Sequence, residues 1–171
     1  MNKLVFFIVI ALWGEIAYPQ NIAVDVENLK VAFVYNFSKY ISWPDSVLAT
    51  AEDVVLCIAG DASLIAKFNG LDGQLTNQKT IRVVAMHAPD EAIQKCHILF
   101  ISAAYPTDTR QLLLSFGNKP LLTVGDSRGF SSQGGIIELM EVDNRITFRI
   151  NNPQAVAKNL DISSKLLRLA R

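Results

Sequence analysis

The sequence predicts an α/β fold of three layers, in which a mostly parallel sheet carries helices on both faces and gains a C-terminal antiparallel hairpin. Between residues 54 and 126, apolar runs typical of strands buried on both faces alternate with helical segments. Two further strand-like runs, 135–142 and 145–150, are then separated only by Asp143-Asn144, which is a hairpin signal. The chain has 171 residues and half of them are apolar, so one domain with a sizeable core is expected.

The N-terminus has the pattern of a secretory signal peptide. Lys3 precedes ten apolar residues, 4–13, that carry no charge. This run is too short to cross a bilayer, which takes about 20 residues. The cleavage motif is poor, and we place cleavage after Ala23; the alternative is a buried N-terminal strand or helix. We therefore expect a signal peptide at 1–23 and an exported domain at 24–171, with no transmembrane span of its own.

The first helix is predicted over 27–43. Apolar residues at 29, 33, 37, 40 and 41 recur at helical spacing, and Pro44 is expected to end the helix. The segment is rich in aromatic residues, which we interpret as core packing.

Strands and helices then alternate. The predicted strands are 54–60, 80–86, 97–102 and 120–126. The predicted helices are 61–68, 89–95 and 108–116, with Asp61 as the N-cap of the first and Pro89 opening the second. A flavodoxin-like strand order, 2-1-3-4, would place the first and third strands side by side.

The C-terminal segment returns to helix. Asn152-Pro153 is expected to cap one helix, and Asn159 to interrupt it. The last residues form an amphipathic turn or two, with Leu166 and Leu167 toward the core.

The two cysteines, Cys57 and Cys96, leave two interpretations open. In an oxidising compartment an even number favours a disulfide, here closing a loop of about 40 residues. The alternative is two buried free thiols. Cys57 lies late in its strand and Cys96 precedes its own, while a disulfide needs Cα atoms within about 7 Å. The bond therefore depends on the stagger of the two strands.

The sequence offers no catalytic set around Ser127, although Gly-Asp-Ser occurs in some serine hydrolases. A nucleophilic serine needs a base within hydrogen-bond reach, and neither His87 nor His97 stands in a suitable context. The pattern Gly-x-Ser-x-Gly is also absent. We expect no enzymatic activity; Asp126 and Ser127 read more simply as turn residues.

The sequence gives little support for binding of phosphate, metal ions or nucleic acid. Gly129 and Gly134 are spaced as in a phosphate-binding loop, but Gly135 stands where that loop has its lysine. The histidines and cysteines lack metal-ligand spacing, so no metal or cofactor is expected. Sixteen basic and sixteen acidic residues cancel, which argues against nucleic-acid binding.

One candidate binding surface is the edge where parallel strands end. Gly60-Asp61, Ser102-Ala103 and Gly125-Asp126 each follow a predicted strand, and ligands of open parallel sheets bind at this edge. The simpler interpretation is helix capping and turn formation. Asp61 and Asp126 are therefore candidates for binding a small ligand or a partner.

Seven sequence blocks resemble the YfiR family of periplasmic proteins over residues 28–171. The blocks are KVAFVYNFSKYISWP, LCIAGD, CHILFIS, LLTVGDSRGF, GGIIEL, RITFRIN and SSKLLRLAR. The resemblance implies a dimeric periplasmic repressor, which binds the periplasmic sensor domain of an inner-membrane diguanylate cyclase. Cys57 and Cys96 fall at family positions. Better-known members carry a second cysteine pair near the fourth and fifth blocks, where this chain has Ser131 and Ser132 instead.

A docking surface for a partner needs exposed anchors, and arginine and aromatic side chains are the usual ones. Arg128 and Phe130 lie in a loop expected to be exposed, although Phe130 can also fold back onto the sheet. Gln133, beside glycines, would allow close backbone approach. Glu138 lies in an apolar strand and needs exposure or a partner, for which Arg149 across the hairpin is a candidate.

The function we expect is therefore a periplasmic regulator that binds and inhibits an inner-membrane diguanylate cyclase, lowering cyclic di-GMP signalling, and that forms a homodimer. The alternative is a periplasmic small-solute-binding module that uses the carboxyl edge of the sheet.

Overall fold

The computed structural model describes residues 25–49, 51–86, 95–142 and 145–171. Three predicted features lie outside the described residues: the signal peptide, all but the last residue of the helix at 89–95, and the hairpin turn Asp143-Asn144.

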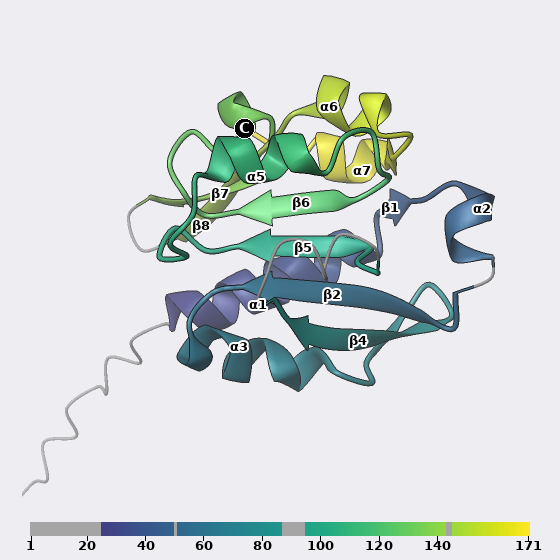
Figure 1. The fold of residues 1–171 in the computed structure, drawn as a ribbon, viewed down its shortest axis with the longest axis horizontal. Helices are drawn as coiled ribbons and strands as arrows, with labels where there is room; N and C mark the ends of the chain where they lie inside the picture. Colours follow the sequence, from purple (N-terminus) through teal and green to yellow (C-terminus); the bar gives the residue numbers. More distant parts are fainter. Residues whose placement is uncertain (1–24, 50, 87–94, 143–144) are drawn as a thin grey trace, which may run out of the picture.

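Seven strands, counted within the described part of the chain, form one sheet, and Figure 1 shows it curling toward β7 and β8. Its order is β3 (Leu75–Thr76), β4 (Lys79–Ala85), β2 (Asp53–Ala59), β5 (Ile98–Ile101), β6 (Leu122–Gly125), β7 (Ile137–Val142) and β8 (Arg145–Ile150). The strands from β4 to β7 run parallel, and β3 and β8 are antiparallel edges. The predicted strand order and the C-terminal hairpin are confirmed.

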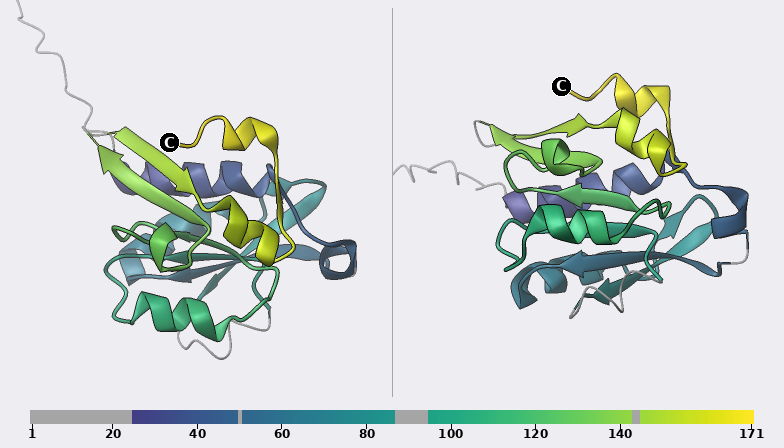
Figure 2. Two further views of the ribbon diagram at one scale, coloured as in Figure 1. Left: turned by 90° about the horizontal axis from the view of Figure 1, so that it is seen from above. Right: turned by 45° about the horizontal axis from the view of Figure 1, so that its top comes forward.

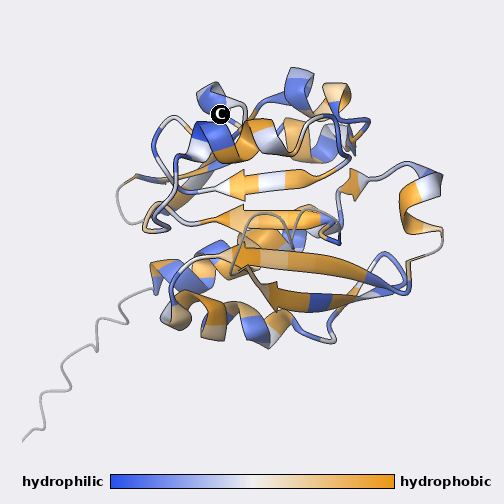
Figure 3. Cartoon of the chain, in the orientation of Figure 1, coloured by the Kyte–Doolittle hydropathy of each residue, from blue (hydrophilic) through white to orange (hydrophobic). Residues whose placement is uncertain are grey.

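Helices cover both faces of the sheet, as predicted. Helices α1 (Val26–Ser38) and α3 (Ala62–Phe68) pack on one face, and α5 (Thr109–Ser115) packs on the other (Figure 2). Successive side chains of β2 alternate between the faces, so Leu56 faces α1 and α3 while Cys57 faces α5. The central strands are apolar along nearly their whole length (Figure 3), because both of their faces are buried.

The first helix ends five residues before the predicted 27–43 does, at Ser38, so the prediction for its end was wrong. Ile41–Ser42 forms β1, which pairs with β9 (Asp161–Ile162) in a separate two-stranded ribbon. Pro44 then acts as the N-cap of a short helix, α2 (Asp45–Leu48), instead of stopping α1. This pairing partner lies about 120 residues away in the sequence, so helical periodicity alone did not predict the change.

Short elements complete the chain. The sequence did not predict β3, whose turn to β4 places Asn77 and Gln78 at positive φ. At the C-terminus, α6 (Asn152–Ala157) is capped by Asn151, one residue before the predicted position, and Asn159 follows it at φ 56°. The last helix is α7 (Ser164–Leu167), and two 3₁₀ turns, η1 (Asn69–Leu71) and η2 (Ser131–Gln133), lie in loops.

Cys57 and Cys96 form a disulfide, with Cα atoms 5.9 Å apart. The register pairs Cys57 with Leu99, so a Cys96 that continued β5 backwards would lie too far along the sheet. The chain instead bends at His97, and Cys96 packs against the α5 face beside Cys57. This bend resolves the problem of stagger that the sequence left open.

Within the ranges that the structure describes, no helix is both long and apolar enough to cross a membrane.

Candidate functional site

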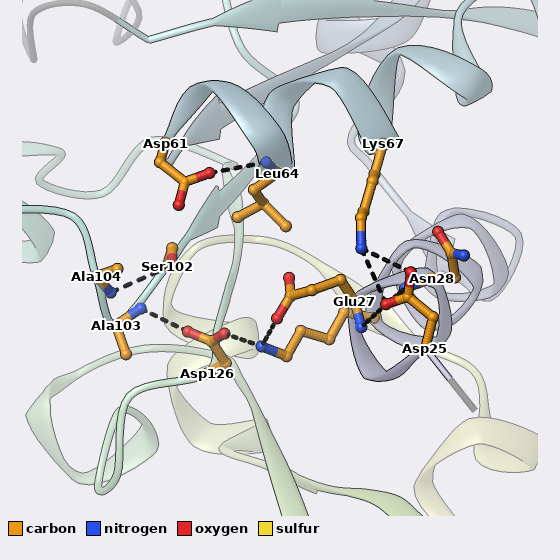
Figure 4. Close-up of polar contacts among 11 residues, drawn as sticks. Asp25, Glu27, Asn28, Asp61, Leu64, Lys67, Ser102, Ala103, Ala104 and Asp126 are labelled. Carbon is orange, nitrogen blue, oxygen red and sulfur yellow. Dashed lines mark hydrogen bonds and ion pairs between the residues drawn. The ribbon is translucent and has the colours of Figure 1, made fainter. Parts of the chain in front are cut away.

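The carboxyl ends of β2, β5 and β6 meet at one edge of the sheet, as the sequence predicted. There Asp61, Ser102, Ala103 and Asp126 surround a pocket of about 340 Å³. Glu27 of α1 (Figure 4) and Lys30, one turn further along the same helix, complete its wall. Sequence analysis did not find these two residues, although they are the two charged side chains of an otherwise largely apolar helix, one turn apart.

Asp126 ties three segments together at this edge. One carboxylate oxygen accepts a hydrogen bond from the Ala103 backbone N–H at 2.6 Å. The other accepts one from Lys30 Nζ, also at 2.6 Å, and Lys30 in turn contacts Glu27 at 2.6 Å (Figure 4). The Asp126 side chain is only 9% exposed. It therefore acts first as a link between α1, β6 and the loop after β5.

Burial of Lys30 by itself would lower the pKa of this ammonium group. Hydrogen bonds and charge from Asp126 and Glu27 more than offset that effect, so the pKa of Lys30 lies above its ordinary value. Lys30 thus stays charged at any physiological pH, and the link to Asp126 persists.

Two further carboxylates near this edge, Asp61 and Asp25, are helix caps. Asp61 accepts a hydrogen bond from the Leu64 backbone N–H at 2.8 Å, which confirms its prediction as an N-cap. Asp25 caps α1 and contacts Lys67 of α3 at 2.7 Å (Figure 4). The Asp25–Lys67 contact therefore holds the first turn of α1 beside the last turn of α3.

The loop that follows Asp126 is held by Glu138, which lies on β7 and is buried. Its carboxylate accepts hydrogen bonds from the Gly129 backbone N–H at 2.8 Å and from Ser131, through its N–H at 3.1 Å and its Oγ at 2.6 Å. Arg149 lies directly across the hairpin, with its guanidinium 3.8 Å from the carboxylate. Glu138 therefore has the partner that the sequence suggested, together with three closer donors from the loop.

Phe130 fills the space under this loop and is fully buried. A Cβ atom built on Gly125 would lie 2.5 Å from the Phe130 ring, and one built on Gly135 would lie closer still. Neither glycine has a positive φ, so backbone conformation does not require glycine at these positions. Glycine is needed because the Phe130 ring occupies the space where a side chain would stand. Phe130 thus takes the inward orientation of the two that the sequence left open, and its ring is not exposed as an anchor for a partner.

The six candidate residues divide into two groups. Phe130 and Glu138 are buried and shape the loop, and Asp61 and Asp126 use carboxylate oxygens for internal donors. Arg128 is exposed, and Gln133 is half-buried on η2. Arg128 is therefore exposed as the sequence predicted, whereas the buried side chains of Phe130 and Glu138 are not available to a partner.

A groove of about 600 Å³ adjoins the edge pocket, and Asp126 lines both. Its other walls are Arg128 and Gly129 from the loop, residues 138–141 of β7, and Arg149 of β8. Four candidate or partner residues of the sequence analysis thus lie around one groove: Asp126, Arg128, Glu138 and Arg149.

The described residues form no serine–histidine pair. Ser127 Oγ is buried without a hydrogen-bond partner there, while His97 Nδ1 accepts the Val55 backbone N–H at 2.9 Å. Burial, and then the charges of Lys79 and Arg82, lower the pKa of His97. Across the same residues no group of three or more histidine, cysteine or acidic side chains is arranged to hold a metal ion.

The fold places the protein in the class of α/β proteins whose pocket and groove lie beyond the carboxyl ends of parallel strands. Within that class the chain belongs to the YfiR/HmsC-like family, whose family model matches residues 27–171. Membership indicates a periplasmic regulator of diguanylate cyclase signalling, in a family that is regulatory and not catalytic.

Structural comparison supports the fold alone. A crystal structure of a conserved domain protein from Vibrio cholerae O1 biovar El Tor aligns with a TM-score of 0.58 at 9% sequence identity. The alignment covers 84% of this chain and 58% of that chain. No curated protein sequence matches the chain.

Glu138 predicts a pH-dependent loss of stability. Burial by itself would raise its pKa, but the hydrogen bonds from Ser131 and Gly129 and the charge of Arg149 hold the pKa below the ordinary value of a glutamate. A carboxylate with a lowered pKa stabilises the fold above its unfolded-state pKa, and this contribution is lost as pH falls through the folded-state value. Glu138→Gln should therefore lower the unfolding free energy by about 2 kcal/mol at pH 7, and by progressively less below about pH 4.5.

Urea unfolding at pH 7 and at several values below 4.5 measures this difference. Trp43, the single tryptophan of residues 24–171, provides the fluorescence signal. Glu141→Gln, an exposed carboxylate on the same strand, serves as control and should change stability by no more than about 0.5 kcal/mol. A Glu138→Gln deficit that is the same at every pH would contradict the argument.

Proposed function

We propose that this chain is a periplasmic repressor, which binds the periplasmic sensor domain of an inner-membrane diguanylate cyclase and keeps the cytoplasmic cyclase inactive. The observation that carries the proposal is the family match over residues 27–171, which includes every element around the edge pocket and the groove. The signal-peptide pattern of residues 1–23 and the Cys57–Cys96 disulfide fit an oxidising compartment.

Repression requires differential binding. A protein shifts the equilibrium of its target only as far as it binds one state more tightly than the other. A tenfold reduction in active cyclase therefore needs about 1.4 kcal/mol of difference between the two states. A groove of about 600 Å³ beside a rigidly held loop offers a surface that one state of a sensor can match better than the other.

Deleting the gene should raise cellular cyclic di-GMP, and supplying the full chain in trans should lower it again. Deletion of the cyclase gene should abolish both effects, because the repressor has no enzymatic route of its own to the nucleotide. A chain that lacks residues 2–23 is the matched control: it should leave cyclic di-GMP high because it stays in the cytoplasm. An unchanged nucleotide level in the deletion strain would rule out the proposal.

We propose that the repressor acts as a homodimer, as the family resemblance implies. The solute-binding alternative is less well supported by the geometry of the edge pocket. Asp61 and Asp126 already accept hydrogen bonds from backbone N–H groups, and Asp126 also binds Lys30. Few polar groups are therefore left to select a small ligand.

A further inference from the structure

The β7–β8 hairpin extends beyond the end of β6 and leaves one side of β7 open. Strand β6 pairs only with Ile137 and Glu138, whereas β8 pairs with β7 as far as Val142. Figure 2 shows the hairpin reaching past the rest of the sheet. From Leu139 onward, β7 thus has a neighbouring strand on one side only.

The backbone groups of Glu141 point to the open side. The Phe148 carbonyl accepts a hydrogen bond from the Arg171 N–H at 3.0 Å, so it points away from β7. Phe148 pairs with Leu139, which makes this a non-hydrogen-bonded pair of the antiparallel ladder. By the alternation of such ladders, the N–H and C=O of Glu141 face away from β8, and they have no partner among the described residues.

At the opposite end of the sheet, the outward backbone groups of β4 have hydrogen-bond partners, unlike those of Glu141. Strand β3 covers the start of β4, and the Gln74 carbonyl accepts the Ile81 N–H at 2.8 Å. The Asp72 side chain then accepts the Val83 N–H at 2.8 Å. Such protection is usual at sheet edges, because exposed strand edges pair with other chains.

The groove of about 600 Å³ runs along the open edge of β7, with Leu139 and Met140 as its apolar part. The wall formed by the loop and β8 carries two arginines. Arg128 is exposed and has no ion-pair partner among the described residues, and the Arg149 side chain is 54% exposed. Asp126, Glu138 and Glu141 line the same groove. The oxygens of Asp126 and Glu138 already accept internal hydrogen bonds, and strand alternation places the exposed Glu141 side chain on the opposite face of β7 from Glu138.

We propose that this groove binds an extended, acidic segment of the partner protein, which pairs with the open edge of β7 where β6 stops and sets a carboxylate against Arg128 and Arg149. The inference rests on the proposed function, and it names the surface and the chemistry of the contact. Strand addition supplies backbone hydrogen bonds, and arginine–carboxylate contact supplies specificity. An extended polypeptide fits because the free groups are a strand's own N–H and C=O.

Two substitutions test the two parts of the contact. Glu141→Pro removes the free N–H at the open edge and leaves the β7–β8 hydrogen bonds in place. Glu141→Ala is its matched control, since it removes the side chain but keeps the N–H. Arg128→Glu reverses the free charge at an exposed loop position whose side chain forms no ion pair among the described residues.

Two quantities are measured for each variant. The first is the cyclic di-GMP level when the variant is supplied to the deletion strain. The second is its affinity for the purified periplasmic sensor domain of the cyclase whose deletion abolishes the effect. Each variant is first checked for thermal unfolding like that of the wild-type chain. Glu141→Pro and Arg128→Glu should each weaken binding about tenfold or more and release the cyclase. Glu141→Ala should bind and restrain as the wild-type chain does.

The possible failures are distinguishable. If the wild-type chain does not restrain the cyclase, the proposed function itself fails. If it does, but a folded Glu141→Pro or Arg128→Glu variant restrains equally well, the groove inference is overturned. Loss of restraint by Glu141→Ala would also overturn it, because the side chain and not the strand edge would then matter. A Glu141→Pro variant that changes from dimer to monomer in sedimentation would assign the edge to a second copy of the chain and overturn the assignment to the partner.

Discussion

Phe130→Ala is expected to lower the unfolding free energy by about 3–5 kcal/mol, and Gly135→Ala by about 2–3 kcal/mol. The Phe130 ring is fully buried between Gly125 and Gly135, and a Cβ atom on either glycine would overlap it. The first substitution leaves a cavity under the loop, and the second forces the ring out of place. Urea unfolding followed by Trp43 fluorescence measures both losses.

A double-mutant cycle separates this packing from other effects. In the Phe130→Ala background no ring stands near residue 135, so adding Gly135→Ala should cost little or even stabilise the fold by about 0.5 kcal/mol through the unfolded state. Gly70→Ala is a matched control, because a Cβ atom there has no neighbour within 4 Å and its φ is not positive. If the Gly135→Ala loss were the same with and without Phe130, the close contact would not be its cause.

Much of the fold followed from the sequence because its signals are local. Apolar runs such as 54–60 are long enough to mark strands buried on both faces, and Asp61 and Asp108 mark the starts of helices. Strand order was predictable too, since the handedness of βαβ connections leaves few arrangements for a chain of this pattern. Errors occurred where a distant segment decides the structure, as at Ile41–Ser42, which pairs with β9.

The candidate site was less predictable, and for a specific physical reason. Lys30 and Asp126 are 96 residues apart, and neither residue's neighbours in sequence indicate the other. Around Phe130, the sequence argued against a phosphate-binding loop, but it did not indicate that the glycines leave space for a buried ring, because that depends on side-chain packing. Glu138 was identified as needing a partner, but the loop donors that satisfy it come from a turn that the sequence did not define.

The Cys57–Cys96 disulfide depends both on the local path of the chain before β5 and on the pairing of β5 with β2. From sequence, the compartment favoured the bond and the positions of the two cysteines in their strands argued against it. The bend at His97 lets Cys96 leave the line of β5 and lie over the sheet near Cys57. A strand assignment extended backwards from β5 would have missed this bend, since His97 still bonds the β2 backbone through Val55.

Replacing both cysteines, as Cys57→Ala with Cys96→Ser, is expected to lower the unfolding free energy by about 4 kcal/mol, because the bond closes a loop of about 40 residues in the unfolded chain. Cys57 is buried, so alanine suits its position, and serine suits the half-buried Cys96. Urea unfolding with and without dithiothreitol measures the loss.

Reduction of the wild-type chain separates the cross-link from side-chain packing. The reduced wild type keeps both sulfur atoms in place and loses only the covalent bond, so on the chain-entropy account it should be nearly as unstable as the double variant. The double variant itself should not respond to dithiothreitol. A reduced wild type that stayed within about 1 kcal/mol of the oxidised protein would show that the two cysteines contribute through packing, and that the fold around the bend at His97 holds without the bond.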